Sequence, residues 1–416
     1  MTHPNDNRRI LIIGDAVAPT GFARVIRSIF QPLHRDFELH QMATRYDNGP
    51  HDYSWPLYPA KQAGDVYGYS QLPKIVNEIR PAVVFLLYDL TFQTRYLNVL
   101  RRLTPQPKTV FYSPVEAGPV APEIVGQLQG VTRYVLFTEY GRQEIAKSLK
   151  LVRRDNADFN FPELEVIPHG VDCEKFYPLG NEAPLVKGAK TIPARRLLAR
   201  EQLGIADPEH RDAFIVLNAN RNMPRKRIDL TMQGFAEFAR DKPADVKLYL
   251  HMATEDTGWN VLILARRYGI YDRLMMTKAD NSQPRLTDEQ LNVLYNACDV
   301  GITTTTGEGW GMVSFEHAAT KSAQIIPHHT SLAELWDGAA EFIEPSSKMT
   351  YPGNLTEGSV VSVEDVAKAL EQVYADDVYR EKIAEAGYQN AKRPELKWDK
   401  IAEQWRQVLS EVIEGA

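Results

Sequence analysis

The sequence predicts an α/β protein made of two Rossmann-like domains, each a parallel sheet covered by helices on both faces. Short apolar runs alternate with helical patterns, which is the arrangement typical of such sheets. The alternation occurs twice, before and after a segment at residues 168–178 that contains proline and glycine but no helical spacing. A length of 416 residues also fits two domains of roughly 100 to 200 residues each.

In the first half, six short apolar runs are interpreted as strands, and most of the spans between them carry helical spacing. The expected strands are residues 10–13, 38–42, 83–87, 109–112, 134–137 and 165–167. The expected helices are residues 22–33, 71–79, 92–103 and 140–149. Because parallel strands need crossover connections, the helices between them fit this pattern.

The second half repeats the pattern and ends in helices. Its expected strands are residues 214–217, 247–251, 273–276, 300–303, 323–326 and 340–343. Residues 179–189 are interpreted as a polar loop, and residues 195–203 as the helix that enters this half. The last helix, residues 398–413, carries one apolar stripe and is expected to pack on a neighbour. We place the first domain at residues 1–175, the second at 176–395 and the final helix at 396–416.

The composition is that of a soluble globular protein, with 44% apolar and 25% charged residues. The longest apolar run, residues 82–88, is far shorter than the roughly 20 residues that span a bilayer. No signal-peptide pattern opens the chain, so we expect a cytoplasmic protein. The two cysteines, Cys173 and Cys298, predict neither a disulfide framework nor a zinc site, and we expect no metal.

The net charge of −6 argues against a protein that binds nucleic acid over its whole surface. Residues 1–178 carry 20 basic and 19 acidic residues, which leaves 28 and 35 for the rest. The first half therefore leaves room for an anionic partner. A basic run at Lys147, Lys150, Arg153 and Arg154 is typical of a solvated helix face. Contact with a phosphorylated lipid at a membrane surface, or with nucleic acid, is the alternative.

The segment TTTTGEGWGMVSFEHAA, residues 303–319, is the strongest candidate for a functional site. It predicts a strand end, a glycine-rich turn and a helix that begins near Met312. Such a turn can point backbone N–H groups at an anion, and Glu316 on the helix can accept hydrogen bonds from ribose hydroxyls. Glu308 lies at the lip of the turn. Glycines that only permit close packing, with two surface glutamates, are the alternative explanation.

Two further segments follow expected strand ends. In NANRNMPRKRIDL, residues 218–230, Arg221 and Lys226 are five positions apart and precede or open a helix. A planar fork and a point charge suit a diphosphate, although a solvated basic face fits the same letters. In GDAVAPTGFARV, residues 14–25, only Gly14 and Gly21 are present, so the segment departs from the full dinucleotide-binding pattern. A mobile phosphate-covering loop and a plain strand-to-helix connection both remain open.

Together these segments resemble the family-4 retaining glycosyltransferases of the GT-B fold. The matching stretches are IPHGVDCEKFYP, NRNMPRKRIDL, LTDEQLNVLYNACDVGITTTTGEGWGMVSFEHA and TGFARVIRSIF. They cover nearly the whole chain, most firmly residues 163–343. The resemblance implies two Rossmann-like domains facing across a deep cleft, with the acceptor in the first and the nucleotide sugar in the second. It also implies that the C-terminal helix crosses back to the first domain.

In that family, an Arg and a Lys hold the donor diphosphate, one Glu lies by the donor sugar and a second Glu binds the ribose. The resemblance gives these roles to Arg221, Lys226, Glu308 and Glu316. We therefore name as catalytic candidates Arg221, Lys226, Glu308 and Glu116. We name as donor-binding candidates Gly21, Gly309, Trp310, Gly311, Met312 and Glu316.

The first half departs from the family pattern. Many members have a histidine after a first-domain strand, whereas the corresponding stretch here is FYSPVEAGPVAP, residues 111–122. Ser113 or Glu116 is the candidate for that place, and Glu116 fits either a loop residue or a carboxylate that orients an acceptor hydroxyl. Asp15 and Asp89 also follow expected strands and are lesser candidates. His169 is interpreted as a hinge or packing residue.

The resemblance implies a retaining, metal-independent hexosyltransferase-like enzyme. It would use no cofactor, a UDP- or GDP-linked sugar as donor, and a glycan, lipid-linked or small-molecule hydroxyl as acceptor. A glycosyltransferase acting on modified DNA bases and a non-catalytic nucleotide-sugar-binding protein are the alternatives. The absence of the full glycine pattern after the first strand disfavours a dehydrogenase.

Overall fold

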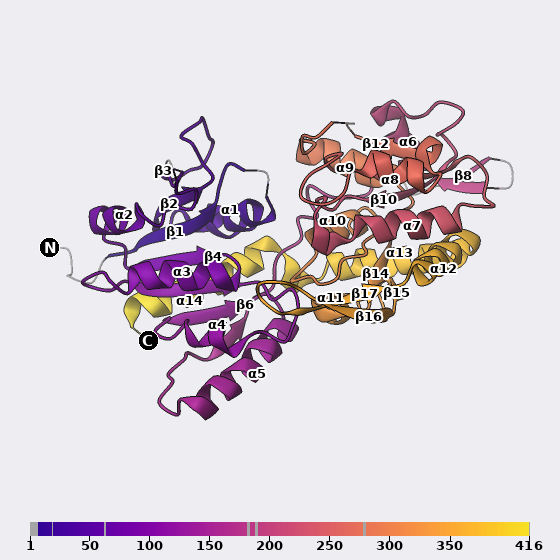
Figure 1. Cartoon of the computed structure of the whole chain (residues 1–416). Helices are drawn as coiled ribbons and strands as arrows, with labels where there is room; N and C mark the ends of the chain where they lie inside the picture. The colour runs from indigo at the N-terminus through magenta and orange to yellow at the C-terminus, as the bar shows by residue number, and fades with distance from the viewer. Residues whose placement is uncertain are drawn as a thin grey trace. The chain divides into compact units, whose positions relative to one another are not determined.

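The computed structural model describes residues 7–18, 20–61, 64–180, 184–187, 190–277 and 280–415. The chain forms two compact units. The first contains Met1–Gly170, Pro352–Thr356 and Pro394–Ala416, and the second contains Val171–Tyr351 and Glu357–Arg393. Each unit is built on a parallel sheet with helices on both faces (Figure 1).

The first unit has a seven-stranded parallel sheet in the order β3-β2-β1-β4-β5-β6-β7. The strands are β1 (Arg9–Asp15), β2 (Glu38–Thr44), β3 (Leu57–Pro59), β4 (Val83–Leu87), β5 (Lys108–Ser113), β6 (Arg133–Leu136) and β7 (Leu164–Val166). The strand order reverses between β1 and β4, and ligands of open α/β sheets bind outside the carboxyl ends of the strands at such a reversal. β4 is buried along its whole length, as an inner parallel strand should be.

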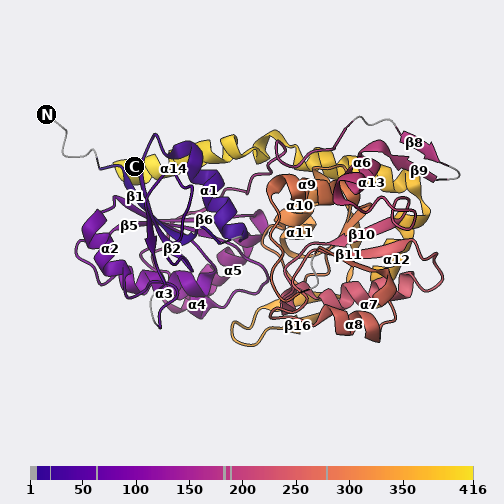
Figure 2. The same cartoon turned by 90° about the horizontal axis from the view of Figure 1, so that it is seen from above.

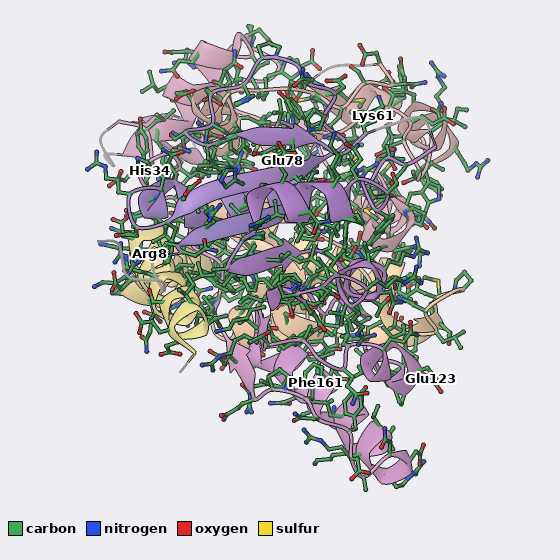
Figure 3. All side chains as sticks on the ribbon, turned by 90° about the vertical axis from the view of Figure 1, so that its left-hand side faces the viewer. Arg8, His34, Lys61, Glu78, Glu123 and Phe161 are labelled. Carbon is green, nitrogen blue, oxygen red and sulfur yellow. The ribbon has the colours of Figure 1, made fainter. Side chains whose placement is uncertain are left out.

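Helices cover both faces of this sheet. They are α1 (Gly21–Leu33), α2 (Leu72–Ile79), α3 (Leu90–Leu100), α4 (Pro122–Gly126), α5 (Glu139–Asp155), the 3₁₀ turn η3 (Pro394–Leu396) and α14 (Trp398–Glu414). In Figure 2, α1 and α14 lie on one face, while α2, α3 and α4 lie on the other. Phe161, labelled in Figure 3, follows α5 and packs against Tyr134 of β6 with ring centroids 5.3 Å apart.

The C-terminal helix α14 belongs to the first unit, which confirms that the chain returns there after the second. Trp405 on its apolar stripe is fully buried. Its ring packs edge-on against Phe85 of β4 and Tyr112 of β5, with centroids 5.1 and 4.8 Å away. Such aromatic contacts contribute beyond the buried area alone, so α14 is an integral part of this core.

The second unit has a six-stranded parallel sheet in the order β12-β11-β10-β13-β14-β15 and two separate hairpins. The sheet strands are β10 (Phe214–Asn218), β11 (Val246–Leu250), β12 (Leu274–Met276), β13 (Val300–Ile302), β14 (Ala323–Pro327) and β15 (Glu341–Ile343). The hairpins pair β8 (Pro184–Lys187) with β9 (Lys190–Pro193) and β16 (Pro345–Thr350) with β17 (Glu357–Val361).

The second sheet is likewise covered on both faces. Its helices are α6 (Ala194–Leu203), η1 (Pro224–Lys226), α7 (Ile228–Phe238), α8 (Val261–Arg267), η2 (Tyr271–Arg273), α9 (Asp288–Ala297), α10 (Met312–Ala318), α11 (Thr330–Leu335), α12 (Val363–Ala375) and α13 (Asp377–Ala391). In Figure 2, α7, α8 and α12 lie on one side of β10 and β11, and α9, α10 and α13 lie on the other. No helix of the described residues is both long and apolar enough to cross a bilayer.

The predicted fold class is confirmed, and each of the predicted strands overlaps a strand of one of the two sheets. The expected polar loop at residues 179–189 is wrong over 184–187, which form β8. Residues 181–183 and 188–189 of that stretch lie outside the described residues. Leu185 pairs with Ile192 and Val186 with Thr191. Two adjacent apolar positions are too few to be told from a loop by periodicity.

Candidate functional site

Four threonines continue the chain from the carboxyl end of β13 and tie it to the segment around η1. Thr303 to Thr306 are all buried, so their hydroxyl and backbone groups need partners inside the protein. The Thr304 hydroxyl donates to the carbonyl of Arg227 at 2.7 Å. The backbone N–H of Thr306 donates to the carbonyl of Arg225 at 2.9 Å. The threonine run therefore fixes η1 beside the glycine-rich turn that follows.

The two basic side chains of η1, Arg225 and Lys226, contact one carboxylate of the glycine-rich turn, that of Glu308. Arg227, directly after the buried Lys226, adopts a left-handed conformation with φ of 47° and is the N-cap of α7. The Lys226 ammonium contacts Oε2 of Glu308, and the Arg225 guanidinium lies 3.3 Å from the same oxygen. Arg225 also donates to the carbonyl of Gly307. Two of the predicted catalytic candidates, Lys226 and Glu308, are thus in contact with each other, and Arg225 is a third member of the group.

The charges around Glu308 keep it ionised. Its side chain is only 13% exposed, and burial acts to raise its pKa. The nearby positive charges of Lys226 and Arg225 outweigh burial and lower the pKa from 4.5 to about 2. Glu308 is therefore a carboxylate throughout the neutral range. It can accept hydrogen bonds from hydroxyl groups or stabilise positive charge, but it cannot serve as a general acid there.

The turn after Glu308 leads into α10. Gly311 has φ of 90°, a conformation that glycine adopts without the clash that a Cβ would cause. Trp310 is 3% exposed, and its ring stacks on Phe315 with centroids 5.2 Å apart. Gly309 is buried, whereas Gly311 and Met312 are partly exposed. The Trp310 side chain thus packs into the core and holds the turn in place. Because that side chain is buried, the predicted contact of Trp310 with a donor would have to be made by its backbone.

Glu316 lies on α10 and is 7% exposed. The Tyr295 hydroxyl of α9 donates to its carboxylate at 3.0 Å. The hydrogen bond from this neutral hydroxyl fixes the orientation of the buried carboxylate. Its predicted role, binding two ribose hydroxyls, needs such an acceptor and stays a prediction.

Arg221 is placed differently from Lys226. Its Nε lies 2.6 Å from Oδ2 of Asp256, and its Nη2 lies 3.2 Å from Oδ1. The Arg221 side chain is 52% exposed, and its hydrogen bonds lower the pKa of Asp256. This two-pronged pair orients the guanidinium and leaves other N–H donors of the fork available. Its predicted role in binding diphosphate therefore stays a prediction.

Sequence reasoning missed three residues of this site. Arg225 was overlooked because it lies in the basic run PRKR, where spacing alone cannot tell which side chain turns inward. Asp256 is 35 positions from Arg221, and Tyr295 is 21 positions from Glu316, so neither pair leaves a local signal. The one available signal was the acidic pair Glu255 and Asp256 after a predicted strand.

The first-unit candidates surround the carboxyl edge of their own sheet. Gly21 is the first residue of α1 and is exposed, after Thr20 as N-cap. Ser113 ends β5 and is buried, and its hydroxyl accepts from Tyr134 at 2.9 Å. Glu116 is partly buried in the loop between β5 and α4. The Ser113 hydroxyl therefore belongs to a core hydrogen-bond network, while the roles predicted for Gly21 and Glu116 stay predictions.

Asp15 and His169 are both buried in the first unit. Asp15 ends β1 and accepts hydrogen bonds from the hydroxyls of Thr44 at 2.6 Å and Tyr88 at 2.7 Å. His169 lies 4.0 Å from the ring of Phe137 and 5.4 Å from that of Tyr112, measured between centroids. Burial lowers the pKa of His169 to about 3, so the ring is neutral at pH 7. These contacts fit the predicted packing role of His169.

Solved structures with the same fold are numerous, although no family model and no curated protein matches the sequence. Sucrose-phosphate synthase from Thermosynechococcus elongatus superposes with a TM-score of 0.71 at 14% identity, over 98% of this chain and 99% of its own. Anabaena HepE in complex with UDP and glucose gives 0.68 at 15% identity, over 97% and 100%. A UDP-forming trehalose-phosphate synthase from Burkholderia vietnamiensis gives 0.66 at 12%, over all of both chains.

The likeness extends over essentially the full length of both partners in each comparison, so it includes both sheets and the returning helix α14. Identities this low establish the architecture and not the activity. The chain has the GT-B fold.

Proposed function

We propose that this protein is a retaining glycosyltransferase that moves a sugar from a nucleotide-diphosphate sugar to a hydroxyl-bearing acceptor. The observation that carries the proposal is the convergence of Lys226 and Arg225 on Glu308 at the carboxyl edge of the second sheet. Open α/β sheets bind ligands at that edge. The comparison structures of HepE, which were solved with UDP and glucose or with UDP-glucose, support a sugar nucleotide as ligand.

The two cations suit a diphosphate leaving group. Glu308 neutralises one of the two positive charges, so the group of three retains a net positive charge. A diphosphate would compete with Glu308 for Lys226, and the ammonium would then stabilise the charge that grows as the glycosidic bond breaks. Arg221 would add a planar fork, held by Asp256, for a second set of phosphate oxygens.

The proposed reaction keeps the anomeric configuration and needs no protein nucleophile. Glu308 is ionised and committed to two cations, so it is a poor proton acceptor. We infer that a phosphate oxygen of the departing diphosphate takes the proton of the attacking hydroxyl on the same face. The positive side chains supply the charge that a metal would otherwise provide, so we propose a metal-independent transfer.

The test first determines which class of sugar nucleotide the protein binds. The purified protein is incubated with UDP-, GDP- and ADP-linked sugars, and unfolding temperature, nucleotide release and transfer to a panel of glycan and small-molecule hydroxyls are measured. The proposal predicts a thermal shift with one donor class, since a ligand at 100 times its Kd adds about 2.7 kcal/mol to stability. Nucleotide release should persist in excess EDTA, and NMR of the first product should show retention. Binding without release or transfer to any acceptor would support a non-catalytic protein instead.

A further inference from the structure

The β16–β17 hairpin stands apart from the six-stranded sheet and docks on the turn that carries Glu308. Its strands pair with Thr350 opposite Glu357 and Met349 opposite Gly358. The backbone N–H of Ser359 donates to the carbonyl of Thr306 at 2.8 Å. The hydroxyls of Tyr351 and Thr306 are also in contact. The hairpin thus reaches the threonine run two residues before Glu308.

Thr306 is held from two directions. Its N–H donates to the carbonyl of Arg225, and its own carbonyl accepts from Ser359. Thr306 is completely buried, so without the hairpin its carbonyl would lose its hydrogen-bond partner. The N–H of Thr306 is therefore paired by η1, and its carbonyl is paired by the hairpin.

The packing of Gly358 against Thr306 and Tyr351 leaves no room for a side chain at position 358. A Cβ added to Gly358 would lie 2.9 Å from Cβ of Thr306 and 2.9 Å from the Tyr351 ring. Such distances are shorter than a van der Waals contact, so any side chain at this position would push β17 away from the turn. Glycine at position 358 is what allows the two backbones to approach.

We propose that the β16–β17 hairpin is a brace that positions Arg225 and Glu308, and that Tyr351 and Gly358 are its positioning residues. The link passes from Tyr351 and Ser359 to Thr306, from Thr306 to the carbonyl of Arg225, and from the Arg225 guanidinium to Glu308. Neither positioning residue contacts Glu308 in this chain of contacts. Where it concerns turnover, the inference rests on the proposed glycosyl transfer.

Hydrogen exchange tests the brace without any substrate. The full chain carrying Gly358→Ala, and separately the milder Tyr351→Phe, is compared with wild type by mass spectrometry of peptides that cover residues 303–311. The matched control is Lys348→Ala, which removes an exposed pair with Glu357 at 3.0 Å on the same hairpin. We expect exchange of 303–311 to rise at least threefold in Gly358→Ala and to stay at the wild-type rate in Lys348→Ala. Equal exchange in all four proteins would overturn the inference.

Measurements of turnover distinguish a positioning role of Gly358 and Tyr351 from a general contribution to the stability of the fold. In Gly358→Ala and Tyr351→Phe, we expect kcat for nucleotide release to fall about tenfold or more. Donor Kd should stay within about twofold and the unfolding temperature should change little, because preorganisation acts on the transition state. Losses of kcat that simply follow losses of unfolding temperature would overturn the positioning role. A wild-type protein that releases no nucleotide contradicts only the proposed function. Hydrogen exchange of residues 303–311 then tests on its own whether the hairpin holds the turn in place.

Discussion

The carboxyl edge of each sheet holds a carboxylate that is largely shielded from solvent, and the direct partners of the two carboxylates differ. In the first unit, Asp15 is 3% exposed and accepts hydrogen bonds from Thr20, Thr44 and Tyr88 at 2.9, 2.6 and 2.7 Å. In the second unit, Glu308 is met by two cations. The hydrogen bonds to Asp15 therefore come from neutral hydroxyls, with the charge of Arg45 acting on it as well, whereas Glu308 is in direct contact with two cations.

Under the proposed function, the diphosphate of the donor would bind at the edge that carries the cations. Burial and then the Asp15 charge raise the pKa of Tyr88, so its hydroxyl stays protonated and acts as a donor. In this network the donor hydroxyls and the accepting carboxylate are paired with each other inside the protein, which favours a rigid structure. The two cations beside Glu308 instead outnumber its single negative charge, and under the proposed function a diphosphate would bind there.

The largest effect is expected at Lys226. Lys226→Ala removes the ammonium that would stabilise the leaving diphosphate, and losing such a stabiliser costs roughly 100- to 1,000-fold in kcat. Nucleotide release measures it. Lys242→Ala is the control, because Lys242 pairs with Glu371 on the same unit at 2.7 Å and has no predicted part in the site. Similar rates for both variants would contradict the assigned role of Lys226.

A smaller effect is expected at Arg221. Arg221→Ala should lower kcat/KM for the donor at least about tenfold, since a charge-assisted contact contributes roughly 1.5–3 kcal/mol. Asp256→Asn keeps Arg221 but weakens the pair that orients it, and we expect an intermediate loss of a fewfold. If Asp256→Asn were as damaging as Arg221→Ala, Asp256 would have a role of its own.

At the first edge, the expected effect is on stability and not on the donor. Asp15→Asn replaces one accepting oxygen by an amide donor, so at least one hydroxyl loses its partner at a cost of about 1–3 kcal/mol. Urea unfolding measures that loss, with the exposed Asp47→Asn as control. The thermal shift caused by a sugar nucleotide should be the same in wild type and Asp15→Asn. A weakened shift would mean that the first edge also serves the donor.

The smallest effect is the pH dependence of stability at the second edge. The pKa of Glu308 is about 2 in the folded protein, below its ordinary 4.5. Ionised Glu308 therefore contributes stability that is fully present above about pH 4.5 and is lost as the pH falls toward 2. Urea unfolding between pH 6 and pH 3 should show a shallower decline in Glu308→Gln than in wild type. Parallel curves would contradict the pairing with Lys226.

Much of the fold is predictable because buried parallel strands leave continuous apolar runs, as in VVFLL of β4 and FIVLN of β10. Strands with few apolar positions left no such signal, and β3 and the β16–β17 hairpin were missed. At the site, Lys226, Glu308 and Glu316 are recognisable from the segments that follow strand ends, and the resemblance assigns their roles. Arg225 and Asp256 were not, because inward orientation and contacts between distant segments arise only when the chain folds.

The most direct measurement is a crystal structure of the protein with a sugar nucleotide bound. The proposed function predicts that the diphosphate lies at the carboxyl edge of the second sheet. It should be within hydrogen-bond distance of Lys226 and of the guanidinium of Arg221 or Arg225. Glu308 should then have released Lys226 and turned toward the sugar. A diphosphate bound elsewhere, with Lys226 still paired to Glu308, would contradict it.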